Sequence, residues 1–352
     1  MKNQIDWNWY NGKKVLITGH TGFKGSWLCK ILLHFNAEVY GYGLEPPTNP
    51  ALYEIAGLEN VHSFIGDIRD FETLKTFFDK VQPEIVFHLA AQPLVMTSYK
   101  DPKYTYETNV MGTVNILECV RLSHCVKSMV NITTDKVYEN REWCWGYRED
   151  EKLDGHDPYS NSKSCSELVT HSYIKSYFAD RQVAVSTARA GNVIGGGDFA
   201  ENRIIPDCIR AACKKQDIEV RNPNSIRPYQ HVLEPLRAYL MIAKRQYENY
   251  SYAGYYNIGP DECDCLTTGE LVSMFVERWG DGLTWKSNQI AQAPHEANFL
   301  KLDSSKVKAE VGWIPKWHID EAIEATVHFA KIWSKNGDVQ AEMLSEIQQY
   351  FG

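Results

Sequence analysis

The sequence predicts an α/β protein with a doubly wound parallel sheet and a smaller mixed α/β lobe. Short apolar runs alternate with helical patterns through the first half, glycines follow the first run, and the alternation weakens after Arg189. Strands separated by helix-length segments indicate βαβ units, in which helices cover both faces of the sheet. At 352 residues and 43% hydrophobic, the chain is long enough to bury a large core.

Six runs in the first half have the composition of buried strands. They are residues 15–18, 38–44, 62–65, 85–91, 129–133 and 183–189. Apolar residues at helical spacing predict helices over residues 27–35 and 71–80. Further on, we expect a helix over 231–247 and a short strand over 255–258 that return the chain to the first lobe.

The first domain therefore comprises residues 1–190 and about 231–258. The second lobe comprises residues 191–230 and 259–352.

Composition excludes several classes of function. A formal charge of -8 gives no basic field for nucleic acid. The nine cysteines form no CxxC pair, and the closest two, Cys263 and Cys265, have no nearby second pair for a tetrahedral metal site. We therefore expect free thiols and no metal.

The chain also lacks membrane signals. Residues 1–14 have no apolar signal-peptide segment, and no run of about 18 apolar residues could span a bilayer. We expect a soluble cytoplasmic protein with no membrane partner.

The glycine loop gives the first functional signal. Gly19, Gly22 and Gly25 stand three apart between the first strand and the first helix, with Thr21 and Phe23 among them. Such glycines permit a tight turn, close approach of a pyrophosphate, and close packing of helix on strand, while the helix N-terminus offers N–H groups to an anion. The alternative is a glycine-rich turn without a ligand. The flanking strand and helix favour a Rossmann-like dinucleotide site.

Two further segments suit a dinucleotide. Asp67 and Ile68 follow the third strand, where a carboxylate could accept from the adenine amino group, although Asp67 could instead cap a helix. Small residues end the fourth strand, at Leu89, Ala90 and Ala91. Residues 40–44, at the end of the second strand, contain no acidic residue to accept from the ribose hydroxyls, but Glu45 follows directly. No arginine stands there to bind a 2′-phosphate, so we expect NAD rather than NADP.

Tyr159 and Lys163 form a candidate reactive pair. Four residues apart at the start of a helical stretch, they share one helix face. We expect the ammonium to lower the phenol pKa, which would make Tyr159 a base for a sugar hydroxyl, while Lys163 holds the nicotinamide ribose. The alternative is a solvated helix face.

Polar residues also follow the fifth strand, where the carboxyl edge of a parallel sheet meets its ligand. Thr134 could hydrogen-bond a sugar oxygen, Asp135 could donate a proton to a departing hydroxyl, and Lys136 could act as a base. The alternative is a polar loop with a surface Asp–Lys pair.

Over essentially its whole length the chain resembles the extended short-chain dehydrogenase/reductases, and within them the CDP-glucose 4,6-dehydratase branch. The matching segments are residues 18–28, 66–71, 87–95, 108–113, 131–143, 157–163, 189–199, 227–236 and 294–303. The resemblance adds Asn109 and Thr133 to the expected NAD site.

The activity that the resemblance implies is loss of water from CDP-D-glucose, giving CDP-4-dehydro-6-deoxy-D-glucose for deoxysugar biosynthesis of the O-antigen and lipopolysaccharide kind. Tyr159 would deprotonate the C4 hydroxyl, Thr134 would bind the C4 oxygen, and Asp135 would protonate the departing C6 hydroxyl. Hydride would pass from C4 to NAD and return to C6. Related dehydratases place a glutamate where this sequence has Lys136, so the C5 base is Lys136 or another residue.

The resemblance also implies a substrate site and an assembly. Residues of the second lobe would hold the diphosphate and nucleoside: Asn192, Arg203, Arg227, His231, His295 and Glu296. Met96 stands where the family has arginine. Helices over residues 102–122 and 159–178 would form a four-helix interface in a homodimer.

Two classes of alternative remain. A 4-epimerase or a dehydratase of another nucleotide sugar would use the same Tyr159, Lys163 and NAD, but an epimerase needs no acid at Asp135. A non-catalytic dinucleotide-sensing protein typically loses the tyrosine or the lysine, and this chain has both.

Overall fold

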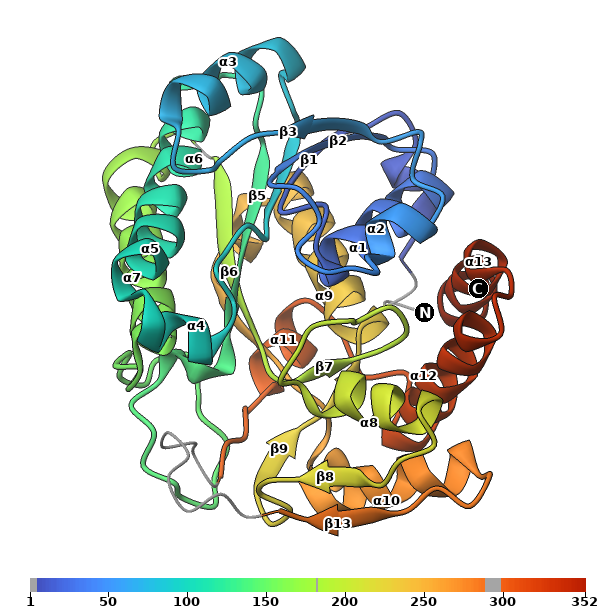
Figure 1. Cartoon of the computed structure of the whole chain (residues 1–352). Coiled ribbons are helices and arrows are strands. Elements are labelled where there is room, and N and C mark those ends of the chain that lie inside the picture. Colours follow the sequence, from blue (N-terminus) through green and yellow to red (C-terminus); the bar gives the residue numbers. More distant parts are fainter. Residues whose placement is uncertain (1–4, 182, 289–298) are drawn as a thin grey trace.

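A seven-stranded parallel sheet forms the centre of the molecule (Figure 1). The computed structural model describes residues 5–181, 183–288 and 299–352. The strand order is β11-β6-β5-β4-β1-β2-β3, and all neighbours pair in parallel. The strands are β1 (Lys14–Thr18), β2 (Glu38–Gly43), β3 (His62–Ile65), β4 (Ile85–His88), β5 (Ser128–Thr134), β6 (Ala184–Ala190) and β11 (Tyr255–Ile258).

Helices cover both faces of this sheet. Val15 and Ile17 of β1 face one apolar core, whereas Leu16 between them faces another, because successive side chains of a strand point to opposite sides. The first core includes α1 (Phe23–His34) and α9 (Leu233–Glu248), and the second includes α3 (Phe71–Val81), α6 (Gly112–Leu122) and α7 (Pro158–Tyr173). The doubly wound fold predicted from the alternating pattern is therefore confirmed.

Short elements connect and extend these layers. They are α2 (Leu52–Ile55), α4 (Val95–Lys100), α5 (Pro102–Tyr106), α11 (Ser305–Glu310), π-helical turns η2 (Glu107–Met111) and η4 (Ile174–Phe178), and 3-10 turns η1 (Trp7–Tyr10), η3 (Asp135–Val137), η5 (Tyr250–Tyr252) and η6 (Glu262–Asp264). The turn η2 joins α5 to α6, and η4 extends α7, so both helical stretches predicted at 102–122 and 159–178 are continuous.

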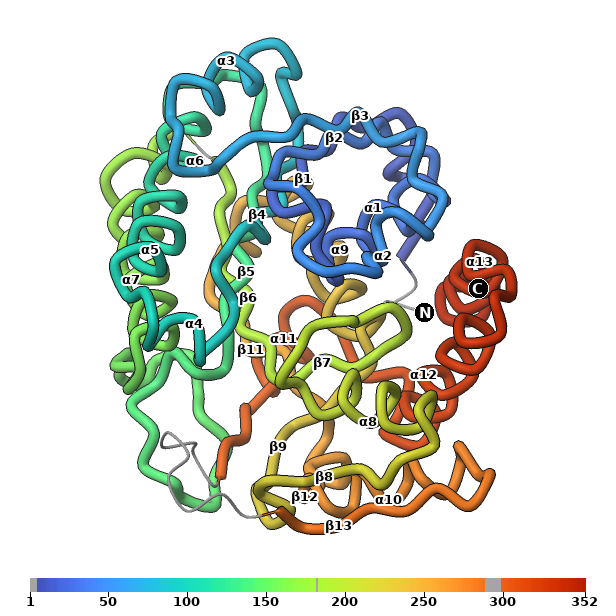
Figure 2. The backbone as a smooth tube through the Cα atoms, in the orientation of Figure 1, coloured from blue at the N-terminus to red at the C-terminus, as the bar shows by residue number. Residues whose placement is uncertain are grey.

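The second lobe is built from short two-stranded sheets and helices. Its strands are β7 (Val193–Ile194), β8 (Ile218–Val220), β9 (Ile226–Pro228), β10 (Gln230–His231), β12 (Cys265–Thr267) and β13 (Trp285–Ser287). Its helices α8 (Ile204–Cys213), α10 (Thr268–Trp279) and α12 (Ile319–Ser334) share a third apolar core. Figure 2 shows how the chain leaves this lobe through α9 and β11, and β11 then pairs with β6 as the outermost strand.

The last helix, α13 (Val339–Phe351), packs against α1. Met343, Ile347 and Tyr350 are buried in the same core as β1. The end of the chain therefore contacts the sheet-bearing half of the molecule.

Most predicted boundaries agree with the structure to within one residue. The strands at 62–65 and 255–258 coincide with β3 and β11. Three predictions are wrong at their ends. The helix expected over 27–35 begins at Phe23, because the first turn of α1 contains Lys24, Gly25 and Ser26, which do not continue the apolar spacing. The fourth strand ends at His88 rather than at 91, and the helix expected from 231 begins at Leu233, because His231 pairs with Ile194 in a short strand.

Candidate active site

The glycine loop satisfies the steric conditions of a dinucleotide cradle. A Cβ atom on Gly25 would lie 2.2 Å from the Gly19 carbonyl oxygen, and one on Gly19 would lie 2.8 Å from the Ala90 nitrogen. A Cβ atom on Gly22 would meet nothing closer than 3.5 Å. Gly19 and Gly25 are thus required for packing within the protein, whereas the space beside Gly22 is open. No side chain caps the N-terminus of α1 at Phe23, which leaves this end suited to an anion.

The other predicted cofactor residues surround this loop. The Thr21 hydroxyl donates to the Leu44 carbonyl over 2.8 Å, which fixes the loop to the end of β2. The backbone N–H of Leu89 and that of Ala90 are bound by Thr18, at 3.1 and 3.2 Å, and Ala91 is half-buried beside them. The end of β4 is therefore held directly against the loop.

Asp67 has a different environment from the one expected. Its carboxylate accepts several hydrogen bonds from Arg69, which lower its pKa, and the nearest distance is 2.6 Å. The residue that caps α3 is Asp70, whose side chain accepts from the Thr73 N–H, so the alternative that Asp67 caps this helix is wrong. Ile68 is buried beside Gly112.

Asn109 and Thr133 bind other protein groups. The Asn109 amide bonds the backbone of Gln92 and donates to the Ser162 hydroxyl over 2.9 Å, which ties η2 to α7. The Thr133 hydroxyl donates to Glu167 over 2.5 Å. In this structure both side chains support the frame of the site.

Tyr159 and Lys163 lie in the first turns of α7, at the carboxyl edge of the sheet. Asp157 caps the helix by accepting from the Ser160 N–H, and Pro158 starts it with the backbone angle that a first turn needs. The Lys163 ammonium donates to the Ile132 carbonyl over 2.9 Å and is buried. The face of α7 that carries the pair therefore packs on the end of β5.

The expectation that Lys163 lowers the pKa of Tyr159 is wrong for this structure. Burial raises the pKa of Tyr159 to about 12, against a hydrogen bond to Thr134 that lowers it. Burial also lowers the pKa of Lys163 to about 8, against the attraction of Glu167. Desolvation of the charged forms outweighs the local partners here.

Asp135 has the environment of a proton donor. Its carboxyl is 1% exposed, one oxygen accepts from the Thr134 hydroxyl over 3.0 Å, and within the described part of the chain the other oxygen has no hydrogen-bond partner. Burial raises the pKa of Asp135, against the attraction of Lys136 and Arg227. A Cβ atom on Gly191 would lie 3.1 Å from the unpartnered oxygen, so the glycine keeps space beside the acid open.

Lys24 is a functional candidate that the sequence reasoning missed. It is the second residue of α1, and burial lowers its pKa to about 8, with Arg203 and Lys163 adding to the effect and Asp135 opposing it. The sequence does indicate its position near the cofactor site, because Lys24 lies between Gly22 and Gly25 of the glycine loop. Its approach to Asp135 depends on tertiary structure.

The predicted substrate residues lie in different environments. Arg227 is buried on β9 and lies close enough to Asp135 to affect its pKa, and Arg203 forms a 3.0 Å ion pair with Asp198. Asn192 is half-buried just before β7. His231 is fully buried, with its ring next to Trp27 and Trp317, which is a core position. The predicted residues His295 and Glu296 lie outside the described residues.

Behind the reactive pair lies a buried ion pair that the sequence reasoning also missed. The Arg189 guanidinium donates twice to the Glu167 carboxylate, at 3.0 and 2.9 Å, and neither side chain is exposed. Thr133 and Thr187 donate to the same carboxylate. Glu167 stands one turn after Lys163 on α7 and Arg189 stands on β6, so the pair fixes the reactive helix to the sheet.

Comparison with known proteins identifies the family. The model of the GDP-mannose 4,6 dehydratase family matches residues 16–326. The chain belongs to this family. It is also 48% identical to the CDP-glucose 4,6-dehydratase of Salmonella typhimurium, over 98% of both chains. The predicted family resemblance is confirmed.

Solved structures show the same fold. An epimerase from Methanothermobacter thermautotrophicus has a TM-score of 0.82 at 22% identity and covers 94% of this chain and 95% of its own. The UDP-glucose 4-epimerase of Thermus thermophilus, solved in complex with NAD, has a TM-score of 0.78 at 26% identity and covers 90% and 98%. The GDP-mannose 4,6 dehydratase family therefore shares its fold with epimerases, and fold alone does not distinguish the two reactions.

Proposed function

We propose that the chain is an NAD-dependent CDP-glucose 4,6-dehydratase, which converts CDP-D-glucose to CDP-4-dehydro-6-deoxy-D-glucose and water. The observation that carries the proposal is Asp135: a buried carboxyl with a raised pKa and one unpartnered oxygen, beside Thr134 and Tyr159. The 48% identical relative from Salmonella typhimurium bears the name of this activity. Loss of water needs an acid for the departing hydroxyl, and Asp135 is suited to that role.

The residues of the glycine loop fit NAD. Gly22 leaves space where a pyrophosphate would lie, and the N-terminus of α1 has no side-chain cap. The chemistry that NAD supplies is reversible acceptance of a hydride. Glu45 is exposed just beyond β2, which supports NAD over NADP.

In the proposed mechanism, Tyr159 and Asp135 each transfer one proton, and Thr134 positions the sugar. Tyr159 takes the proton of the C4 hydroxyl, and Thr134 hydrogen-bonds the C4 oxygen. The resulting 4-ketone acidifies the C5 proton, which Lys136 or another base removes. Asp135 gives its proton to the C6 hydroxyl, which leaves as water. As hydride returns to C6, the base that removed the C5 proton gives a proton back to C5. The C4 hydroxyl proton and the C6 hydroxyl together therefore account for the one water that is lost.

We place the nucleotide against the second lobe, formed by residues 191–230 and 259–352. Arg203 and Arg227 supply guanidinium groups on the same side as Asp135, and guanidinium forks match phosphate oxygens. Asn192 would bind in the same place. The burial of His231 supports a packing role for that residue.

A substrate panel tests the proposal. The full-length protein with NAD is incubated with CDP-, GDP-, UDP- and dTDP-glucose, and the products are examined by mass spectrometry. We expect loss of one water from CDP-glucose and abolition of that product by Tyr159→Phe. Tyr173→Phe is a matched control, because this tyrosine lies on the same helix but donates to Glu118, away from the reactive edge.

The same panel separates the alternatives. An isomer of unchanged mass would identify an epimerase, water loss from another nucleotide sugar alone would change the substrate, and NAD binding without any product would support a sensing protein. Epimerases occur among the solved structures of this fold, so the mass change decides between the reactions.

We further propose a homodimer through α5–α6 and α7 with their π-helical turns. Large apolar side chains on these helices are exposed: Met111, Leu122, Leu168 and Tyr177. Figure 1 shows these helices lying together on one side of the sheet. Light scattering should give twice the chain mass, and Leu168→Glu should give the monomer mass.

We also propose a reducing, cytoplasmic location. All nine cysteines are free thiols in the structure. Among the described residues, no helix combines the length and apolar character that crossing a bilayer requires.

A further inference from the structure

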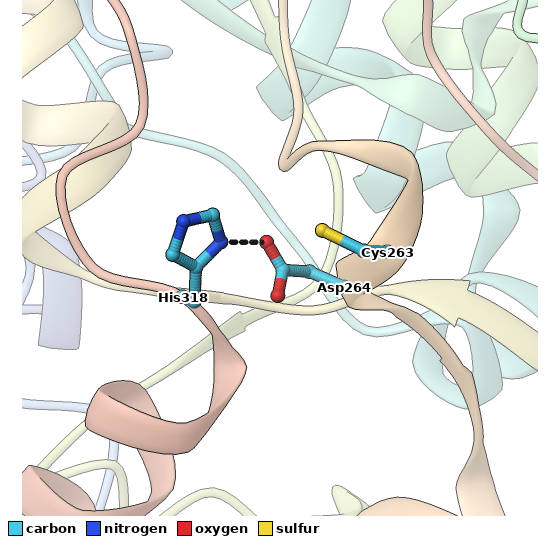
Figure 3. A group of neighbouring side chains, drawn as sticks. All are labelled: Cys263, Asp264 and His318. Atoms are coloured by element: carbon cyan, nitrogen blue, oxygen red, sulfur yellow. Dashed lines mark hydrogen bonds and ion pairs between the residues drawn. The ribbon is translucent and has the colours of Figure 1, made fainter.

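A cluster of metal-ligating side chains lies outside the site described above (Figure 3). Cys263 and Asp264 stand in the turn η6, and His318 stands immediately before α12. The thiol, one carboxylate oxygen and one ring nitrogen all lie within 4.8 Å of one another. No sequence motif indicates this arrangement, because His318 is more than 50 residues from Cys263.

The carboxylate at the centre of the cluster is held in place. Asp264 is 3% exposed, and one of its oxygens accepts from the Ile319 N–H over 3.1 Å. The other oxygen is 2.8 Å from Nδ1 of His318. Cys263 and His318 are exposed, so both can rotate and both can be reached from solvent.

We propose that Cys263, Asp264 and His318 bind one Zn²⁺ ion, in a surface site separate from the active site. Thiolate, imidazole and carboxylate are the ligands that Zn²⁺ takes in proteins, at about 2.3, 2.0 and 2.1 Å. Tetrahedral geometry then requires ligand atoms roughly 3.3 to 3.8 Å apart, which small rotations of the two exposed side chains achieve.

The charges of this site balance. The thiol loses its proton to solvent on binding, so one thiolate and one carboxylate neutralise the dication, and water fills the fourth position. Neighbouring acids do not compete for the ion, because Glu262 pairs with Lys301 and Asp261 pairs with Lys308.

Bound zinc would join two segments of the second lobe. The turn η6 leads into β12, and His318 leads into α12, which packs against α10 in the third core. Because the ligand set is complete only in the folded chain, Zn²⁺ would stabilise this lobe by mass action.

The chain contains a matched control for this site. His328 on the same helix lies 2.8 Å from Glu342, the same distance as His318 from Asp264, but that pair belongs to no cluster of three ligand atoms within the described residues. His328→Gln removes a comparable histidine–carboxylate pair. Cys144→Ser removes a comparably exposed thiol.

Binding is measured on the full-length, fully reduced protein by competition with a chromogenic zinc chelator. We expect one Zn²⁺ per chain, with the affinity reduced roughly 100-fold by Cys263→Ser and by His318→Gln and unchanged by both controls. Co²⁺ in place of Zn²⁺ should give a thiolate-to-metal charge-transfer band that Cys263→Ser abolishes.

Thermal unfolding without metal checks that Cys263→Ser is folded. Absence of stoichiometric Zn²⁺ binding in the wild-type protein would overturn the proposal, as would equal affinity in the wild type and Cys263→Ser. Neither readout uses the dehydratase reaction, so the test is independent of the proposed function.

Discussion

At the scale of single residues, burial controls the chemistry of the candidate site. Tyr159, Lys163 and Asp135 all have pKa values shifted first by desolvation, each toward its neutral form. Burial shifts Asp135 toward the protonated form, which is the form that the proposed proton donation would require. The pKa of Tyr159 is raised to about 12, so the proposed role of this phenol as a base would require a nearby positive charge, which a bound oxidised nicotinamide would supply.

Asp135→Asn should separate oxidation from loss of water. The amide keeps the shape of the carboxyl but has no proton to give, so we expect product formation to fall about 10²- to 10⁴-fold. Transient NADH absorbance at the first turnover should persist, because oxidation at C4 depends on Tyr159. Asp154→Asn, at an exposed ion pair with Lys152, is the control, and simultaneous loss of both signals would contradict the assignment.

Glu167 should set the pH at which Lys163 loses its charge. The carboxylate opposes the effect of burial on Lys163, whose pKa is about 8, so removing this charge lowers the pKa further. The ammonium is then lost at lower pH, and the alkaline limb of the kcat/KM profile should move down by roughly one pH unit. Glu167→Gln with Arg189→Met avoids an unpaired buried guanidinium, and Arg189→Met alone is the comparison. An unmoved limb would contradict the coupling.

At the scale of elements, the glycines of the loop have different roles: Gly25 is needed for packing within the protein, and Gly22 is expected to leave space for NAD. Gly25→Ala places a Cβ atom 2.2 Å from the Gly19 carbonyl, so we expect a loss of about 1 to 3 kcal/mol in the free energy of unfolding. Gly22→Ala has room within the protein and should cost less than about 1 kcal/mol, yet weaken NAD binding. Denaturant unfolding and NAD titration measure the two effects. Equal effects of both substitutions on stability would contradict this division.

Sequence predicts those elements whose determining patterns are local. Glycine spacing, strand composition and the four-residue step from Tyr159 to Lys163 determined the first half of the fold and the reactive pair. The fourth strand is shorter than predicted: the apolar residues beyond His88 fit a strand pattern, but Leu89 and Ala90 donate to Thr18 at the end of β1 and do not extend β4. The ion pair of Glu167 with Arg189 joins a helix to a strand, and no short-range pattern contains it.

At the scale of the whole molecule, the second lobe was the part least predictable from sequence. Its strands are two or three residues long and pair across large sequence separations, as β13 does with β8. Such short strands contain too few residues to show an alternating hydrophobic pattern. Resemblance supplied its substrate residues, and of these the structure brings Arg227 close to Asp135 while His231 lies in the core. The contact of α13 with α1 could not be predicted from a local pattern either, because it joins the two ends of the chain.

Buried titratable groups also lie between α13 and β10, and they should make the stability of the molecule depend on pH. Glu346 of α13 is 4% exposed, lies 3.5 Å from His231, and has a pKa raised well above its usual value by burial and by Glu342. Burial lowers the pKa of His231 to about 3, so this ring stays neutral above pH 4. Burial therefore shifts both groups toward their uncharged forms in the folded protein.

The folded and unfolded chains bind the Glu346 proton with different affinities, which determines how stability changes with pH. The unfolded chain releases the Glu346 proton at lower pH than the folded chain does, so the stabilisation from this group is lost as pH rises above the usual glutamate pKa. Glu346→Gln should therefore raise the thermal midpoint at pH 8 and leave it nearly unchanged at pH 4. His231 acts in the opposite direction below about pH 6.5, but equally in both proteins, so it cancels in the comparison. A Glu346→Gln protein that is less stable than the wild type at pH 8 would show that an ionised carboxylate holds α13 against His231 of β10.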